Sequence, residues 1–468
     1  MKQTIKPTLL NWQLKRRHKR LNEYRYLPDT AQDQKKMLDA LEITSVDELF
    51  SDIPTEIRLT EDLPIPQAVH ESALIKKMRR LAAKNATAHD YTLFLGAGTY
   101  DHYIPSVVDH VISRSEFYTA YTPYQAEASQ GELQALFEFQ TMVCELTGMD
   151  AANSSLYDGF TALGEAATLA VGATKRSKIL ISKAAHPQGR QVLQTVANGH
   201  DYQVTEIDLL NDSTNLTLLE EQLDKETAAV VIQYPNFFGS VEDLAAIKEL
   251  VTAHKALLIV MANPLALALL ESPGKLGADI VVGDMQPMGL AMNFGGPHCG
   301  YFAVKKKYIR KIPGRIIGQT TDTEGKRGFV LTLQAREQHI RREKATSYMS
   351  SNQALNALAS AVFMSALGKE GIKKMAKLNI EKADYMTKQM ENKGFLLKNE
   401  APIFNEFVVQ LNAPIKEINQ LLLKKGFIGG YDLEFDYGMK NAMLIAVTEQ
   451  RTKEEIDQFI EALEGMAK

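Results

Sequence analysis

The sequence is poor in cysteine and carries little net charge. Its 468 residues include only two cysteines, Cys144 and Cys299. Two thiols cannot build a disulfide framework in a chain of this length, and neither lies at metal-ligand spacing from a second cysteine or a histidine. We therefore expect a cytoplasmic protein without a metal site. The formal net charge of −4 provides no basic footprint for nucleic acid, so we expect no nucleic-acid partner.

Long hydrophobic runs are missing as well. The longest apolar stretch, residues 256–270, is interrupted by Asn263 and Pro264 and falls short of the ~20 residues that cross a bilayer. We expect no membrane segment. In residues 1–23 no apolar stretch follows the basic cluster, as it would in a signal peptide. We interpret residues 1–23 as a disordered basic tail or the product of an upstream start codon; binding to an acidic surface is the alternative.

Common catalytic motifs are also absent. The sequence contains no Walker loop, no G-x-S-x-G and no H-E-x-x-H. The glycine-rich segment 295–300 lacks the spacing of a dinucleotide-binding fingerprint, and it follows a loop rather than a first strand. We interpret it as a tight turn that enters a strand over residues 301–304.

Short β-branched runs alternate with helical segments from residue 94 onward. This alternation is typical of an α/β fold in which helices cover both faces of a mostly parallel sheet. The predicted strands are residues 178–182, 203–207, 228–233, 257–261 and 280–282, with helices around 218–225, 241–254 and 265–270. After residue 332 the pattern predicts a small α+β lobe, with a long helix over 353–393, strands at 406–411, 427–435 and 443–447, and helices at 415–425 and 453–466.

These changes in the pattern of predicted helices and strands divide the chain into four predicted parts. They are the tail at 1–23, an N-terminal helical segment at 24–93, a large α/β domain at 94–332 and a small C-terminal α+β domain at 333–468. In the helical segment, Leu74, Met78 and Leu81 recur at helical spacing and predict a helix over 71–83.

One segment has the pattern of an anion site. Residues 153–165 pass from a polar loop into a predicted helix that continues through 166–173. Exposed amides at the start of a helix attract anions. The alternative is a capped helix with a turn at Asp158 and Gly159, which needs no ligand.

Several long motifs occur in a fixed order along the sequence, and together they are specific enough for comparison with a known family. They are LGAGTYDHYIP at 95–105, FYTAYTPYQAEASQG at 117–131, ELTGMD at 145–150, SLYDG at 155–159, GD at 283–284 and FGGPHCGYF at 294–302. In this order they resemble the family of glycine dehydrogenase (decarboxylating) subunit 1, the alpha-type half of the split P-protein of the glycine cleavage system. The resemblance runs from about Arg25 to the C-terminus. The chain departs from the family's pattern at Tyr348-Met349-Ser350.

The resemblance implies the aminotransferase fold type I of pyridoxal-phosphate (PLP)-dependent transferases. Such an enzyme needs a lysine after a late strand for the Schiff base and a carboxylate at the end of an earlier strand for the ring nitrogen. Aligned with the catalytic partner subunit, the carboxylate position falls near Val260 and the lysine position on Pro287. We therefore predict no catalytic residue and no cofactor bound by this chain. The phosphate loop that remains, Ser155, Tyr157, Gly159 and Thr161, is predicted to be vestigial.

The resemblance also implies partners. A beta-type subunit would carry PLP, pair with this chain in a heterotetramer of two plus two, decarboxylate glycine and pass the aminomethyl group to the lipoyl arm of H-protein. Because PLP enzymes of this fold place active sites at subunit interfaces, polar loop residues of this chain can reach the partner's site. The candidates are Thr99, Tyr100, His102, Tyr121, Tyr124 and Gln125; the alternative is a structural loop whose hydroxyls satisfy local backbone groups.

Two further features have a functional and a structural interpretation. His186 matches the place of a ring-stacking residue, but with no ring bound we favour a capping or interface histidine. A basic segment could dock an acidic H-protein, or it could be a solvated helix face. Its members are Arg336, His339, Arg341, Arg342 and Lys344.

Two other functional classes stay open. The chain could be a self-sufficient PLP enzyme that uses an unrecognised lysine, or a scaffold or regulatory protein that has left glycine metabolism.

Overall fold

The computed structural model describes residues 30–59, 63–345 and 352–467. The basic tail and the Tyr348-Met349-Ser350 turn lie outside these residues. The chain divides into two compact units, Met1–Asn85 and Ala86–Lys468, and each is described by itself. The predicted domain boundaries near residues 93 and 332 stay predictions. Among the described residues, no helix is long and apolar enough to span a bilayer.

The first unit consists of short helices with little core. It contains α2 (Ala31–Ala40), the 3-10 turns η1 (Val46–Phe50) and η2 (Thr55–Ile57), and α3 (Glu71–Ala82), which matches the predicted helix. A capping box at Thr30 and Asp33 begins α2. None of these elements has a buried residue, so the unit's apolar side chains stay uncovered within the unit itself.

The second unit is built on a seven-stranded sheet of order β2-β10-β9-β8-β7-β3-β4. Its strands are β2 (Ala151–Ala152), β3 (Lys178–Ser182), β4 (Gln203–Ile207), β7 (Thr227–Tyr234), β8 (Leu257–Ala262), β9 (Ile280–Asp284) and β10 (Gly300–Val304). The five strands from β9 to β4 are parallel, whereas β10 runs antiparallel to β9 and to β2. The predicted mostly parallel sheet is confirmed.

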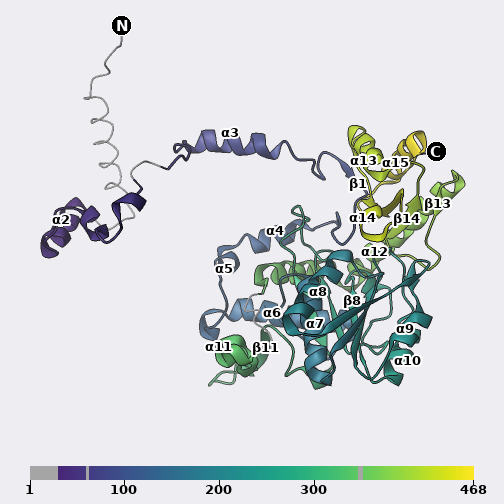
Figure 1. Ribbon diagram of the computed structural model, residues 1–468, viewed down its shortest axis with the longest axis horizontal. Helices are drawn as coiled ribbons and strands as arrows, with labels where there is room; N and C mark the ends of the chain where they lie inside the picture. The colour runs from purple at the N-terminus through teal and green to yellow at the C-terminus, as the bar shows by residue number, and fades with distance from the viewer. Residues whose placement is uncertain (1–29, 60–62, 346–351, 468) are drawn as a thin grey trace, which may run out of the picture. The chain divides into compact units, whose positions relative to one another are not determined.

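Helices cover both faces of this sheet (Figure 1). One apolar core lies against α7 (Gly159–Thr174) and α8 (Pro187–His200). The other lies against α6 (Gln130–Thr147), α9 (Leu216–Gln222), α10 (Leu244–Ala253) and the first part of α12 (Ala354–Asn392). Because both faces are covered, every residue of β8 is buried, which explains its unbroken apolar sequence. Only a 3-10 turn, η4 (Ala266–Ala268), forms where a helix was predicted over 265–270.

A second, smaller sheet follows in the C-terminal part, in the order β13-β14-β17-β16. Its strands are β13 (Leu396–Leu397), β14 (Glu406–Gln410), β16 (Tyr431–Asp432) and β17 (Ala442–Ala446). The helices α13 (Ile415–Lys424) and α15 (Lys453–Ala467) flank it, as predicted. Phe94 lies in the same core and stacks on Phe459 with ring centroids 4.0 Å apart.

Two elements of the C-terminal part differ from the prediction. The single strand predicted over 427–435 is divided at Gly429 and Gly430 into β15 (Phe427–Ile428) and β16, and the chain then enters α14 (Glu434–Tyr437). β15 pairs instead with β1 (Thr92–Leu93), near the start of the second unit. The predicted long helix is observed as α12, but Gly368 inside it has a non-helical backbone.

The close approach of Gly239 to β14 yields a stability prediction. Gly239 has a φ of +85°, and a Cβ atom added there would lie 2.0 Å from the carbonyl oxygen of Glu406. Gly239→Ala should therefore lower the melting temperature by several degrees, because both the backbone and the contact are strained. The control is Gly172→Ala in α7, where nothing lies within 4 Å of the added atom. Equal melting temperatures for the two variants would contradict this account.

Candidate functional site

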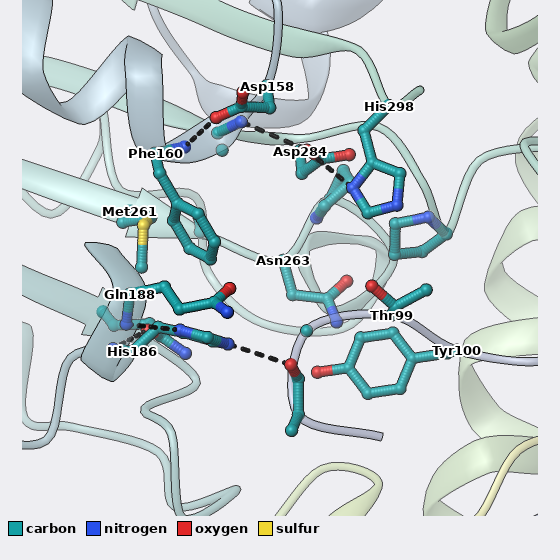
Figure 2. A pocket seen from close by; sticks show the side chains of 18 of the residues that line it. Thr99, Tyr100, Asp158, Phe160, His186, Gln188, Met261, Asn263, Asp284 and His298 are labelled. Atoms are coloured by element: carbon teal, nitrogen blue, oxygen red, sulfur yellow. Dashed lines mark hydrogen bonds and ion pairs between the residues drawn. The ribbon is translucent and has the colours of Figure 1, made fainter. Parts of the chain in front are cut away.

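A cavity of about 570 Å³ opens at the carboxyl ends of β7, β8 and β9. Open α/β sheets bind ligands at this edge because the loops that follow the strands converge there. The cavity is lined by residues from the β7, β8 and β9 ends, the start of α7 and the loop 97–100, with Gln353, Asn405 and Glu406 from the C-terminal part. Figure 2 shows the side chains that face it.

The amides that begin α7 are hydrogen-bonded to carboxylates of the chain itself. Asp158 is the N-cap residue, and its Oδ1 accepts from the amides of Phe160 and Thr161 at 2.9 and 2.8 Å. The amide of Gly159 donates to Oδ2 of Asp284 at 3.1 Å. Gly159 lets the helix start approach β9, since an added Cβ would lie 3.0–3.2 Å from Gly283 and Asp284. The capped-helix interpretation of this segment thus describes the structure, with a second carboxylate that the sequence did not suggest.

His298 compensates part of this negative charge. Its Nδ1 lies 3.3 Å from Oδ2 of Asp284 (Figure 2). Burial acts to lower the pKa of His298, but the hydrogen bond to Asp284, with the charges of Asp284 and Asp158, raises it above its ordinary value. His298 belongs to the glycine-rich segment 295–300, which forms the predicted turn into β10.

His186 caps α8 and supports the neighbouring loop. Its Nδ1 accepts from the amide of Gln188 at 3.2 Å, and its Nε2 lies 2.9 Å from the carbonyl oxygen of Ala97. The ring packs against Phe160, with centroids 4.6 Å apart. Burial lowers the pKa of His186 to about 4, so the ring is neutral near pH 7. The capping interpretation of His186 therefore matches the structure.

Hydrogen bonds hold the loop 97–100 both to Gln286, which follows β9 of the large sheet, and to Glu406 of the C-terminal sheet. The side-chain amide of Gln286 accepts from the amide of Tyr100 at 2.9 Å and donates to its carbonyl oxygen at 2.8 Å. Glu406, at the start of β14, accepts from the amide of Ala97 at 2.7 Å and from the hydroxyl of Tyr100 at 2.8 Å. The loop that lines the cavity is therefore held from both sides.

The described cavity wall contains no lysine, and the end of β8 carries no carboxylate. Pro287 lines the cavity after β9, and no lysine or arginine is among the lining residues that the structure describes. At the end of β8 the residue that faces the cavity is Met261, while Val260 is buried in the core on the opposite face. Neither side chain has a carboxylate that could hold a ring nitrogen protonated. The alignment of the missing carboxylate near Val260 stays a prediction.

The nearest lysines in sequence are engaged elsewhere. Lys275 lies 3.2 Å from Glu271 on the surface, and Lys305 lies 3.4 Å from Asp279 at the amino end of β9. Neither lines the cavity. The structure thus gives no support to an unrecognised Schiff-base lysine at these two positions.

The electrostatics of the cavity also oppose a phosphate group. At an effective dielectric constant of about 20, two like unit charges about 4 Å apart repel by about 4 kcal/mol, whereas a helix N-terminus stabilises an anion by about 0.3–2 kcal/mol. A phosphate at the start of α7 would meet both Asp158 and Asp284. Repulsion outweighs the helix dipole, so the residues present do not fit PLP.

The residues predicted for the phosphate loop and for the partner's site are distributed over several places. Tyr157, Gly159, Thr99 and Tyr100 line the cavity of this chain. Ser155 is buried and its hydroxyl accepts from the amide of Gln353, while the hydroxyl of Thr161 donates to Asp158. His102 is buried, with its Nδ1 2.9 Å from Glu449, and this favours the structural interpretation for His102. Tyr121, Tyr124 and Gln125 are exposed.

The exposed tyrosines lie in the segment that leads to α6. Tyr121 is 86% exposed and Tyr124 is 55% exposed. The hydroxyl of Tyr124 accepts from the buried Arg315 at 2.9 Å, and the guanidinium of Arg315 lies over the Tyr124 ring, 5.4 Å from its centroid. These side chains are free to contact another molecule.

The remaining predicted sites are less defined. His339, Arg341, Arg342 and Lys344 are exposed, and the side chain of Arg336 lies outside the description. Among the described residues, no group of three or more His, Cys, Asp or Glu side chains is placed to hold a metal ion.

Comparison with solved structures defines the class of protein. A NifS-like protein superposes with a TM-score of 0.60 at 14% identity, covering 80% of this chain and 99% of that one. A sphingosine-1-phosphate lyase from Burkholderia pseudomallei gives 0.63 at 15% identity, covering 87% and 92%. The fold is that of the PLP-dependent transferases, and the predicted fold class is confirmed.

Closer relatives define the family. The model of the glycine cleavage system P-protein matches residues 24–463, and the chain belongs to this family. A glycine decarboxylase (P-protein) of the glycine cleavage system, solved in an inhibitor-bound form, superposes with a TM-score of 0.87 at 40% identity, covering 94% of this chain and 100% of that one.

Curated relatives carry the name that the resemblance suggested. "Probable glycine dehydrogenase (decarboxylating) subunit 1" of Bacillus cytotoxicus is 61% identical over 438 residues, which are 93% of this chain and 98% of the relative. The protein of the same name from Bacillus mycoides is 60% identical over the same shares. The predicted family is confirmed.

The buried Glu406 yields a prediction for the pH dependence of stability. Burial raises its pKa from 4.5 to about 7, against the lowering effect of its hydrogen bonds with Ala97 and Tyr100. The folded chain therefore keeps a proton that the unfolded chain loses, so this group's contribution to stability falls as pH rises from about 4.5 through about 7. Glu406→Gln should flatten the fall in melting temperature across that range.

The control is Glu417→Gln on the exposed face of α13. It should leave the pH profile of the melting temperature unchanged. A Glu406→Gln profile parallel to that of the unmodified chain would contradict the assignment.

Proposed function

We propose that this chain is the subunit without cofactor in a heteromeric glycine dehydrogenase (decarboxylating). A beta-type subunit carries PLP, decarboxylates glycine and passes the aminomethyl group to the lipoyl arm of H-protein. The observation that supports this role most strongly is the described cavity wall, which contains no lysine and has Met261 at the end of β8 and Pro287 after β9. The name "subunit 1" of the curated relatives agrees with a second subunit.

The first unit supplies a surface for that subunit. Along one side of α3, the apolar side chains of Leu74, Ile75, Met78 and Leu81 are 43–55% exposed. Large contiguous apolar surfaces are unusual on a protein that works alone. We propose that the beta-type subunit covers this face in a complex of two plus two chains.

The active site of the complex would lie at the subunit interface. Tyr121, Tyr124 and Gln125 are exposed, and we propose that they contribute to the wall of the partner's site. Thr99 and Tyr100 line this chain's own cavity instead.

Docking of H-protein and the location of the complex are further parts of the proposal. The exposed His339, Arg341, Arg342 and Lys344 form a basic surface that suits an acidic H-protein. Both cysteines are free thiols, which agrees with a reducing cytoplasm.

The test is an assay of the separated and combined subunits. The chain and a beta-type subunit are purified separately, and release of carbon dioxide from glycine is measured with lipoylated H-protein for each alone and for the mixture. We expect release at the full rate only from the mixture. Release by this chain alone would overturn the proposal, and full release by the beta-type subunit alone would favour a scaffold or regulatory role.

The apolar face of α3 yields a prediction for assembly. The double variant Leu74→Glu and Met78→Glu should weaken the complex with the beta-type subunit at least about tenfold, because burying two carboxylates in an apolar interface is costly. Its melting temperature alone should stay the same, since both side chains are exposed. Lys76→Glu, on the opposite side of α3, makes the same change in net charge and should leave assembly intact. Sedimentation velocity of the mixture measures the result, and equal loss in both variants would contradict the assigned face.

A further inference from the structure

Arg315 is a buried cation that contacts two exposed segments. It directly precedes β11 (Ile316–Thr321), and only 4% of the residue is exposed. Its carbonyl oxygen accepts from the amide of Ser154 at 2.9 Å. The neighbouring Ile317 exchanges two hydrogen bonds with the side chain of Gln140 in α6. The backbone that carries the guanidinium is therefore fixed.

The first segment that Arg315 contacts is the tyrosine segment 121–125. A guanidinium nitrogen of Arg315 donates to the hydroxyl of Tyr124 at 2.9 Å, and the guanidinium carbon lies 5.4 Å from the centroid of the Tyr124 ring. A planar guanidinium can donate hydrogen bonds and also attract an aromatic ring. Arg315 therefore restrains a side chain that is 55% exposed.

The second segment is the basic segment 337–344. Oε2 of Glu337 lies 3.9 Å from Nε of Arg315 and 3.6 Å from Nδ1 of His339, and the Glu337 side chain is 11% exposed. A carboxylate with so little access to water needs a cation close by. Glu337 is also the N-cap residue of α11 (Gln338–Arg341), so its contact with Arg315 fixes the place where this short helix begins.

The two segments also contact each other. The rings of Tyr124 and His339 lie edge to face, with centroids 6.3 Å apart. After His339 the basic segment continues with exposed charged side chains, which are Arg341, Arg342, Glu343 and Lys344. The tyrosine segment and the basic segment thus adjoin on the surface, and Arg315 is bonded to both.

From these contacts we infer that Arg315 is a positioning residue, which joins the two segments into one docking surface for an acidic carrier protein. The inference rests on the proposed function, in which Tyr124 belongs to the wall of the partner's site and the basic segment binds an acidic protein. Charge complementarity selects the acidic partner. Because Tyr124 adjoins His339, a protein bound to the cations brings its carried group beside the tyrosine wall. Arg315 itself is buried and acts through Tyr124 and Glu337.

The test uses the complex of the full chain with the beta-type subunit, and lipoylated H-protein as the acidic carrier. Release of carbon dioxide is measured against the concentrations of H-protein and of glycine. Arg315→Met keeps an unbranched side chain but removes the charge and the donors. It should raise the KM for H-protein about five- to fiftyfold, and change kcat and the KM for glycine less than about threefold, because only docking is altered.

Further variants distinguish positioning from a general structural role. Arg315→Lys keeps the charge but not the planar fork, and should recover part of the lost affinity for H-protein. Tyr124→Phe removes the acceptor from an exposed side chain and should raise the KM for H-protein about two- to fivefold. The double variant Arg315→Met and Tyr124→Phe should match Arg315→Met, since both changes break the same contact. The control is Arg310→Met on the exposed turn after β10, which should behave as the unmodified chain does.

A measurement on the chain alone separates this inference from the proposed function. Amide hydrogen exchange in Arg315→Met should rise in both segments, 121–125 and 337–344, and in Arg310→Met it should rise in neither. Exchange that rises in only one segment or in none, or an unchanged KM for H-protein, would overturn the inference while the complex stays active. An unmodified complex that releases no carbon dioxide would instead overturn the proposed function, and the docking role with it. If Arg315→Met fails to fold, Arg315→Lys and Tyr124→Phe decide the question.

Discussion

The pairing of the first amides of α7 with Asp158 and Asp284 determines what this cavity can hold. In PLP enzymes of this fold, the same amides are available to the cofactor phosphate. Here the chain supplies two carboxylates of its own, one from the helix cap and one from the end of β9. The loop, the helix and the sheet have the fold of the PLP enzymes. The start of α7, however, is bonded to carboxylates of the chain itself.

Further contacts within the chain hold the rest of the site. His186 caps α8 and contacts the carbonyl oxygen of Ala97, and Gln286 holds the backbone of Tyr100. Glu406 reaches the same loop from the C-terminal sheet. These contacts fix the loop 97–100.

Much of the fold could be predicted from the sequence because the sheet is buried on both faces. Unbroken apolar runs such as β8 leave a signal that does not depend on neighbours. The strand predicted over 427–435 failed for the opposite reason: Gly430 has no side chain because the backbone of Leu444 passes there, and nothing local reveals that contact. The lack of a lysine between Lys275 and Lys305 can be read directly from the sequence, because it is a property of one short segment.

The negative charge of the cavity could not be predicted from a short segment of the sequence. Glu406 and Ala97 are 309 positions apart, and Gly159 and Asp284 are 125 apart, so their contacts exist only in the folded chain. Met261, and not Val260, lines the cavity because neighbouring residues of a strand face opposite sides of the sheet. Motifs identified the family, whereas the geometry explains why this member's cavity excludes phosphate.

Equilibrium binding of PLP to the purified chain tests the central claim most directly. The chain is incubated with PLP, treated with borohydride, freed of small molecules and examined by absorbance and peptide mass spectrometry. The account predicts no retained cofactor and no pyridoxyl-modified lysine in this cavity. A stoichiometric aldimine band that borohydride traps on one lysine would contradict it.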